Sequence, residues 1–232
     1  MSAEDVGAYD GCRRRLAGLV AAGDPSVPVP ACPGWSVHDL VAHLAGLAED
    51  VVEGRVDGYG TPPWTAAQVA AGRGRPTAEL LARWEALMPA FATAVADPAR
   101  SAGTVAPLPL LVLFDVAAHE ADARAALGAG GAVDPATVAR CLALSIGSLR
   151  LAASAAGAPP LRVVATGLRS WDVGRGDDPD EVEAEPFELW RALGGRRTRE
   201  EVAALRWRGD PGPHLDGWLL PPMGWPDRPV GP

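Results

Sequence analysis

Residues 113–128, LFDVAAHEADARAALG, have the spacing of an amphipathic helix. The predicted helix spans about Leu110 to Leu127, because Pro109 precedes it and the glycine-rich stretch GAGGA follows it. Asp115 and His119 stand four residues apart within it, so their side chains project from the same face about one turn apart. An aspartate and a histidine with this spacing can reach a common metal ion.

A second helix is predicted from residues 36–47, SVHDLVAHLAGL. Ser36 and Asp39 form an S-x-x-D variant of the capping box, which satisfies free N–H groups at a helix start. His43 follows Leu40 by three residues and precedes Leu47 by four. Its side chain therefore faces inward, among apolar neighbours.

The four histidines leave one good partner for the Asp115 and His119 pair. His38 lies in a first helical turn and His214 in a proline-flanked loop, so both are expected to be exposed. His43, Asp115 and His119 would supply two nitrogens and one carboxylate and leave a fourth position open, as in catalytic zinc sites. Taken singly, the pair also fits a surface ion pair, and His43 fits a core histidine bonded to a carbonyl. Their co-occurrence favours the metal.

The remaining pattern predicts an α+β chain. Helices are expected at residues 4–22, from Thr77 onward and from Pro135 toward Ala156, with a long crossover connection through GYGTPPW. After residue 160 the run LRVVATGLRSWDV is typical of strands, and a helical EPFELWRALGG and a T-x-x-E capping box at Thr198 follow. We expect a helical bundle over residues 1–158 and a small α/β domain over residues 160–225.

Composition excludes several classes of function. A net charge of -8, from 29 acidic and 21 basic residues, argues against nucleic acid as a partner. Every basic residue is arginine, which excludes Schiff-base lysine chemistry and suits a GC-rich genome. No segment approaches the roughly 20 apolar residues of a membrane span, so we expect a soluble, cytoplasmic protein with no membrane partner. Nothing in the pattern predicts an oligomer interface.

The three cysteines also fit a reducing cytoplasm. Cys12, Cys32 and Cys141 are widely spaced and form no C-x-x-C pair, so neither a disulfide framework nor a thiolate zinc cluster is indicated. Cys32 has no histidine or aspartate beside it in a recognisable pattern, and a structural role is expected for it.

Two segments together resemble a known family. VPVPACPGWSVHDLVAHLAG (residues 27–46) and FDVAAHEADARAALG (residues 114–128) are similar to motifs of the mycothiol-dependent maleylpyruvate isomerase family of the DinB-like superfamily. The resemblance implies a DinB-like four-helix bundle that holds zinc, or another divalent metal, through His43, Asp115 and His119. It also implies that Asp122 follows the metal motif and that the C-terminal domain resembles sterol carrier proteins. The family has glutamate where this chain has Asp115, and the shorter side chain would shift the metal, open a water position or weaken binding.

The resemblance also implies an activity. Mycothiol would be the thiol cosubstrate, held on the metal as a thiolate that attacks a small, anionic electrophile in an isomerisation or an S-transfer. Arg196, in the segment RALGGRR, is similar to the family's Gly-Arg signature and would grip a carboxylate of the substrate; a surface arginine at a helix end is the alternative. Two other classes of function stay open, a non-catalytic binding protein with a degenerate metal site and a metal-dependent hydrolase.

Overall fold

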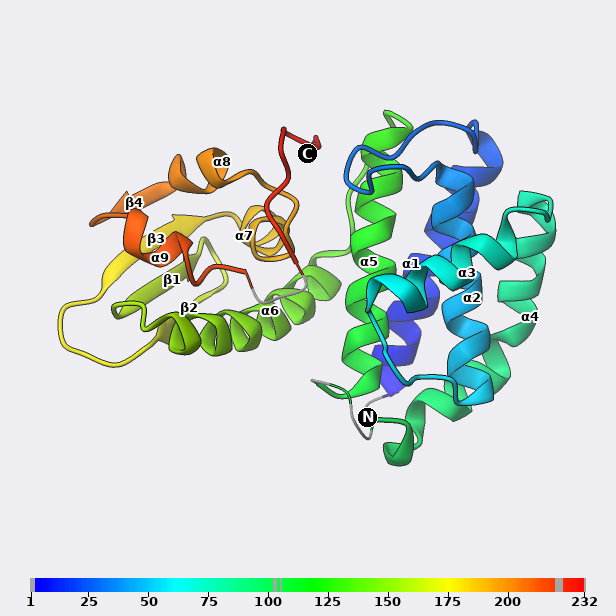
Figure 1. Ribbon diagram of the computed structural model, residues 1–232, viewed down its shortest axis with the longest axis horizontal. Helices are drawn as coiled ribbons and strands as arrows, with labels where there is room; N and C mark the ends of the chain where they lie inside the picture. Colours follow the sequence, from blue (N-terminus) through cyan, green and yellow to red (C-terminus); the bar gives the residue numbers. More distant parts are fainter. Residues whose placement is uncertain (1–2, 102–103, 105, 220–222, 232) are drawn as a thin grey trace. The chain divides into compact units, whose positions relative to one another are not determined.

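The chain folds into two compact units, residues 1–133 and residues 134–231. The computed structural model describes residues 3–101, 104, 106–219 and 223–231. Long helices make up the first unit, and the second combines helices with a small four-stranded sheet (Figure 1). The expected α+β class is therefore confirmed.

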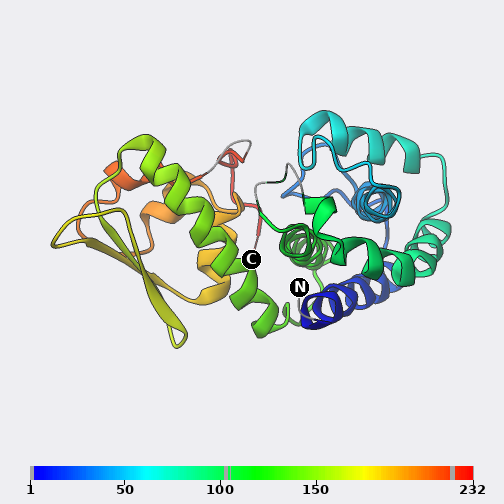
Figure 2. The ribbon, with the colours of Figure 1, turned by 90° about the horizontal axis from the view of Figure 1, so that it is seen from below.

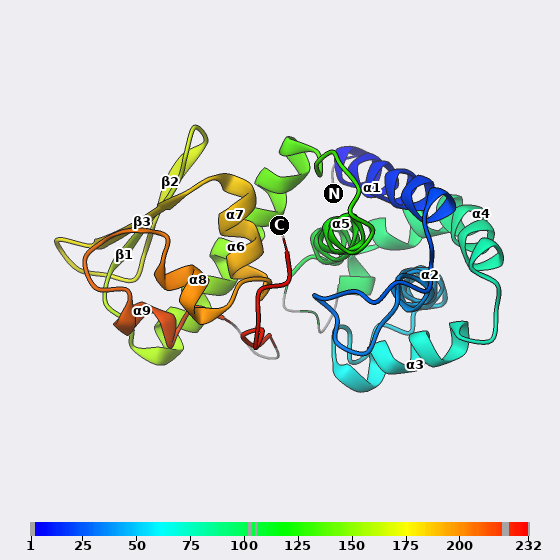
Figure 3. The ribbon, with the colours of Figure 1, turned by 90° about the horizontal axis from the view of Figure 1, so that it is seen from above.

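The first unit is a four-helix bundle with one added helix. Helix α1 packs on α5 and α2 packs on α4, while α3 lies against α2 outside the four (Figure 3). Buried aromatic side chains fill one part of the core, where Tyr9 stacks on Phe91 and its hydroxyl accepts a hydrogen bond from Trp84. The elements are α1 (Ala3–Ala22), α2 (Val37–Glu53), α3 (Pro62–Gly72), α4 (Thr77–Ala96), the short 3-10 helix η1 (Pro98–Ser101) and α5 (Leu108–Ala126).

Helix α2, which carries His43, is fixed at both ends. The Ser36 hydroxyl accepts from the Asp39 N–H, and the Asp39 carboxylate accepts from the Ser36 N–H, so the expected capping box is present. Gly54 ends the helix in the left-handed conformation, with φ of 80°. Twelve of its residues are buried, including His43, so α2 forms the centre of the unit.

Helix α3 is not expected from the sequence. The glycine and proline content of GYGTPPW predicts a connection, yet Pro62 and Pro63 occupy the first helical turn, where a missing N–H costs nothing. Gly72 then allows a close approach, since a Cβ atom there would lie 2.3 Å from the Ala42 Cβ atom. This helix brings Gln68 against α2.

The second unit combines helices with a mixed sheet. The run expected to form strands contains β1 and β2, which pair as an antiparallel hairpin. Strand β3 pairs with β1 in parallel and β4 pairs with β3 antiparallel, which gives the order β2-β1-β3-β4. Val163 aligns with Trp171 on one side and with Val182 on the other. The elements are α6 (Pro135–Ala156), β1 (Leu161–Ala165), β2 (Arg169–Val173), β3 (Asp180–Ala184), α7 (Pro186–Leu193), α8 (Arg199–Ala203), β4 (Arg206–Arg208) and α9 (Gly212–Leu215).

Helix α6 belongs to the second unit. The sequence predicts it as part of a bundle of residues 1–158, but the division falls between Val133 and Asp134, and α6 packs against α7 and β2 (Figure 2). Its apolar side, including Leu142 and Ile146, is buried there. By length and composition α6 is apolar enough to cross a membrane, but half of that stretch is buried, as in the core helix of a folded domain.

Candidate metal centre

The structure brings the three predicted ligands together. His43 Nε2 lies 3.0 Å from Asp115 Oδ2, and His119 Nε2 lies 3.5 Å from Asp115 Oδ1. The two histidines are buried, while the Asp115 side chain is 26% exposed, so the cluster is reached from solvent at the carboxylate. The aspartate touches both rings although it is one methylene shorter than glutamate.

Gln68 determines which nitrogen of His43 carries its hydrogen. The Asp50 carboxylate accepts from Gln68 Nε2 at 2.6 Å, which leaves Gln68 Oε1 facing His43 Nδ1 at 2.7 Å. Since Oε1 can only accept, Nδ1 must donate. When the His43 ring is neutral, its lone pair is therefore on Nε2, which faces Asp115. Arg55 holds Asp50 from the other side, with Nε 2.8 Å from Oδ1.

Asp122 does the same for His119. Its Oδ2 lies 3.1 Å from His119 Nδ1, and the aspartate is fully buried. If Nδ1 donates to this carboxylate, the lone pair of His119 faces Asp115 as well. With both rings neutral, two nitrogen lone pairs and one carboxylate face one another, and a cation among them, either a metal ion or a proton on one ring, removes the repulsion. The donor set suits zinc, and acceptors behind ligating histidines are usual.

The Trp35 ring covers the two histidines, and Tyr59 lies close enough to Asp115 to be affected by its charge. The Trp35 ring centroid lies 5.3 Å from that of His43 and 6.0 Å from that of His119. The hydroxyl of Tyr59 is buried and makes no hydrogen bond to the residues that the structure describes. Burial and the charge of Asp115 raise the pKa of this phenol well above its ordinary value, so it stays protonated.

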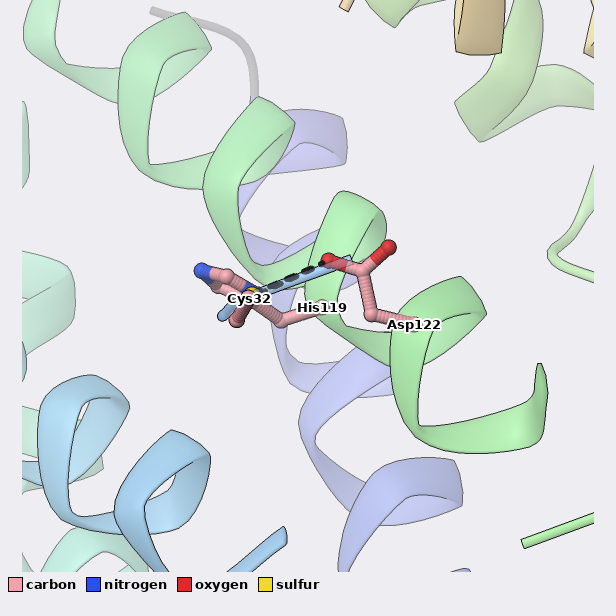
Figure 4. Close-up of side chains that lie close together, drawn as sticks. All are labelled: Cys32, His119 and Asp122. Carbon is pink, nitrogen blue, oxygen red and sulfur yellow. Dashed lines mark hydrogen bonds and ion pairs between the residues drawn. The ribbon is translucent and has the colours of Figure 1, made fainter. Parts of the chain in front are cut away.

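Cys32 lies beside a histidine and an aspartate, contrary to the expectation from the sequence. Its Sγ atom lies 3.9 Å from His119 Nδ1 and 3.8 Å from Asp122 Oδ2. Figure 4 shows the thiol and the Asp122 carboxylate on the same side of the His119 ring, with the other ring nitrogen pointing away. Cys32 comes from the loop before α2, and no spacing in the sequence relates it to α5.

The other two histidines differ from the expectation of exposure. His214 is buried, with Nε2 2.8 Å from Asp180 Oδ2 and its ring stacked on Trp207. The prediction of exposure was therefore wrong for His214, because the Asp180 partner comes from a strand that was not foreseen. His38 is half-buried and its Nδ1 lies 2.8 Å from the Thr77 hydroxyl.

Arg196 lies in the second unit, just after α7. It is half-buried, and its Nη1 donates to the Gly194 carbonyl at 2.8 Å. The neighbouring Arg197 is buried, and Glu188 binds its guanidinium at two points, 2.5 and 2.8 Å. Arg197 is thus part of the framework, and the role of Arg196 at the substrate stays a prediction.

Comparisons with known proteins agree with this architecture. The fold and the buried cluster define a helical-bundle protein with a two-histidine, one-carboxylate centre. A family model described as the mycothiol maleylpyruvate isomerase N-terminal domain matches residues 9–124, and the chain belongs to this family. A search of curated proteins gave no match.

Two solved structures are similar in fold. One is the crystal structure of the mycothiol-dependent maleylpyruvate isomerase, at 15% identity and a TM-score of 0.62, covering 88% of this chain and 91% of that chain. The other is a histidine-to-alanine mutant of that isomerase, at 15% identity and a TM-score of 0.58, covering 83% of this chain and 88% of that chain. The likeness therefore extends well beyond the residues matched by the family model.

Proposed function

We propose that the protein is a metal- and mycothiol-dependent isomerase or S-transferase. The observation that carries the proposal is the convergence of His43 Nε2, Asp115 and His119 Nε2 in the bundle. Membership of the mycothiol maleylpyruvate isomerase family and the fold shared with a solved isomerase of that name support the choice of thiol.

The chain's own residues would prepare the site. A divalent ion bound there would supply the positive charge that keeps a thiol deprotonated near neutral pH. Gln68 and Asp122 hold the hydrogens of His43 and His119 away from the centre. The Trp35 ring shields both histidines from water, and Tyr59 offers a neutral hydroxyl as a hydrogen-bond donor.

We propose that Arg196 binds the anionic part of the substrate. A guanidinium can bind a carboxylate with two parallel hydrogen bonds, which fixes orientation as well as charge. The proposed substrate class is a small electrophile with a carboxylate, of which maleylpyruvate is the first to test because of the solved relative. Nucleophilic addition to its double bond would allow rotation, and release of the thiol would return the cofactor unchanged.

The decisive experiment measures zinc per chain by elemental analysis. We expect about one zinc in the wild type and in Cys32→Ser. In the Cys32→Ser background, zinc should be lost on His43→Ala, Asp115→Ala or His119→Ala. The background matters because the Cys32 thiol lies 3.9 Å from a nitrogen of His119 and offers an additional ligand. Circular dichroism would check that each variant folds.

Turnover then separates the functional classes. Isomerisation of maleylpyruvate, or transfer of the thiol to an electrophile, should require both mycothiol and the metal. Turnover without any thiol would instead indicate a metal-dependent hydrolase, in which water takes the open position. No metal after zinc reconstitution would overturn the enzyme proposal and leave a binding protein.

A further inference from the structure

We infer that Cys32, His119 and Asp122 form a second metal site. This site shares His119 with the first centre, so a metal ion in one of the two sites prevents occupation of the other. The three ligand atoms are Cys32 Sγ, His119 Nδ1 and Asp122 Oδ2, and they are separated by 3.9, 3.8 and 3.1 Å. In tetrahedral zinc, bonds of about 2.0–2.3 Å place ligand atoms roughly 3.3–3.6 Å apart. The observed separations need shifts of only a few tenths of an ångström.

The geometry argues against a nucleophilic triad. In such a triad the base lies between nucleophile and acid, which contact opposite ring nitrogens. Here the thiol and the carboxylate both approach Nδ1 (Figure 4). Three donors around one point are typical of coordination. Cys32 is equally unable to be the fourth ligand of the first centre, which uses the opposite nitrogen, Nε2.

The position of Cys32 is fixed by its loop. An isolated β-bridge joins Pro28 to Ser36, and the Cys32 N–H donates to the Val29 carbonyl while its own carbonyl accepts from the Trp35 N–H. The other two ligands lie three residues apart on α5, where side chains share a face. A site built from rigid elements loses little entropy on binding.

The two sites compete because a neutral imidazole has one lone pair. With metal on Nε2, the hydrogen is on Nδ1 and Asp122 accepts it at 3.1 Å. With metal on Nδ1, the hydrogen is on Nε2 and Asp115 Oδ1, 3.5 Å away, is the acceptor. Each carboxylate is thus a ligand in one state and a hydrogen-bond acceptor in the other. When the second site fills, the Cys32 thiol releases its proton to solvent as the sulfur–metal bond forms.

The second site would favour thiophilic divalent ions. A thiolate is a softer ligand than the nitrogen and oxygen donors of the first centre, so Cd²⁺, Co²⁺ and Zn²⁺ are its chemical class. Occupation of this site would withdraw His119 from the first centre. The inference does not depend on the proposed function, because the second site takes no metal ligand from His43 or Asp115.

Cobalt spectroscopy tests the site directly. Reduced, metal-free protein would be titrated with Co²⁺ without any added thiol, and the near-ultraviolet band of thiolate-to-cobalt charge transfer would be recorded. We expect His43→Ala, which disables the first centre, to give this band at one equivalent. His43→Ala with Cys32→Ser should lose it, and affinity for Cd²⁺ should fall roughly tenfold or more. His43→Ala with Cys141→Ala, which changes a buried thiol of the other unit, should keep the band.

Three results would overturn the inference. The first is a His43→Ala protein with no charge-transfer band, and the second is a band that survives Cys32→Ser. The third is binding of two Co²⁺ per wild-type chain, which would contradict competition for His119. A first centre that binds no metal would be detected separately, as the absence of metal in the Cys32→Ser protein. That variant lacks the second site but keeps His43, Asp115 and His119.

Discussion

His43 Nδ1 lies 2.7 Å from Oε1 of Gln68, a residue on the helix that the sequence did not predict. Gln68 in turn donates to Asp50, which Arg55 also binds. His43 of the candidate metal centre is therefore oriented by a chain of hydrogen bonds that runs from the bundle core to its surface. Such partners determine the direction in which a ligand presents its lone pair.

Replacing Gln68 by leucine should weaken metal binding about 10–100-fold. The change leaves the His43 N–H buried without an acceptor and frees the ring to turn. Competition with a chromophoric zinc chelator measures the affinity, and Ala66→Ser, at an exposed position of α3, is the matched control. Unchanged affinity in a folded Gln68→Leu protein would rule out this positioning role.

Gly46 holds α3 close to α2, and Gly46→Ala should disturb both stability and the site. A Cβ atom at Gly46 would lie 2.8 Å from Gln68 Cβ and 3.3 Å from Gln68 Cα, so α3 must move. We expect a loss of about 1–3 kcal/mol in the free energy of unfolding and weaker zinc binding. Urea unfolding would measure the first and chelator competition the second.

The matched control is Gly18→Ala. A Cβ atom at Gly18, an exposed position in α1, would meet nothing within 4 Å. This change should stabilise the protein by about 0.5–1 kcal/mol. Equal effects at the two glycines would contradict the close approach of α2 and α3.

The long elements were predictable because local chemistry defines them. The capping boxes at Ser36 and Thr198 both occur where the sequence placed them. Strand β3, DEVEA, was not foreseen, because its acidic residues have low strand propensity. It pairs with β1 over five residues, and this long-range pairing stabilises the strand although its local strand propensity is low.

The site was predictable only in part. Asp115 and His119 share one helix, and their spacing alone suggests a common target. Gln68 and Cys32 come from other segments and carry no periodicity that points to α5 or His43. Their positions depend on how α3 packs and how the loop before α2 turns, which is tertiary information.

The capping carboxylate of Asp39 should give a pH-dependent contribution to stability. Burial raises its pKa, but Arg73 and the Ser36 N–H and hydroxyl lower it more, so the folded value is below the ordinary one. A carboxyl with a depressed pKa stabilises the fold above its unfolded pKa of about 4, and this is lost as pH falls through the folded value.

Asp39→Asn should therefore cost about 1 kcal/mol at pH 7, in the range of helix caps. The difference from the wild type should shrink toward zero at the acid end of a series of urea unfolding curves. A difference that is constant with pH would indicate that the charge of Asp39 contributes nothing.

Alkylation should distinguish the three cysteines. Cys12 and Cys141 are buried, and burial raises the pKa of the Cys141 thiol to about 12, whereas Cys32 is partly exposed. Only a thiolate reacts quickly with iodoacetamide, so the native protein at pH 8 should be modified at Cys32 alone. Peptide mapping by mass spectrometry checks this, with urea-unfolded protein as the control that labels all three. Early labelling of Cys141 would contradict the burial.

Alanine substitutions of Arg196 and Arg197, neighbours in the second unit, should have different effects on stability and on substrate binding. Arg197 is buried and bound by both oxygens of Glu188, so Arg197→Ala should lower the free energy of unfolding by about 2–3 kcal/mol. Arg196→Ala should leave stability and zinc content nearly unchanged but raise KM for an anionic substrate, with partial recovery in Arg196→Lys, which keeps the charge and loses the planar fork. Steady-state kinetics beside urea unfolding separates the two roles. An unchanged KM in Arg196→Ala would remove this residue from the substrate site and leave the metal centre as the part of the proposal that stands.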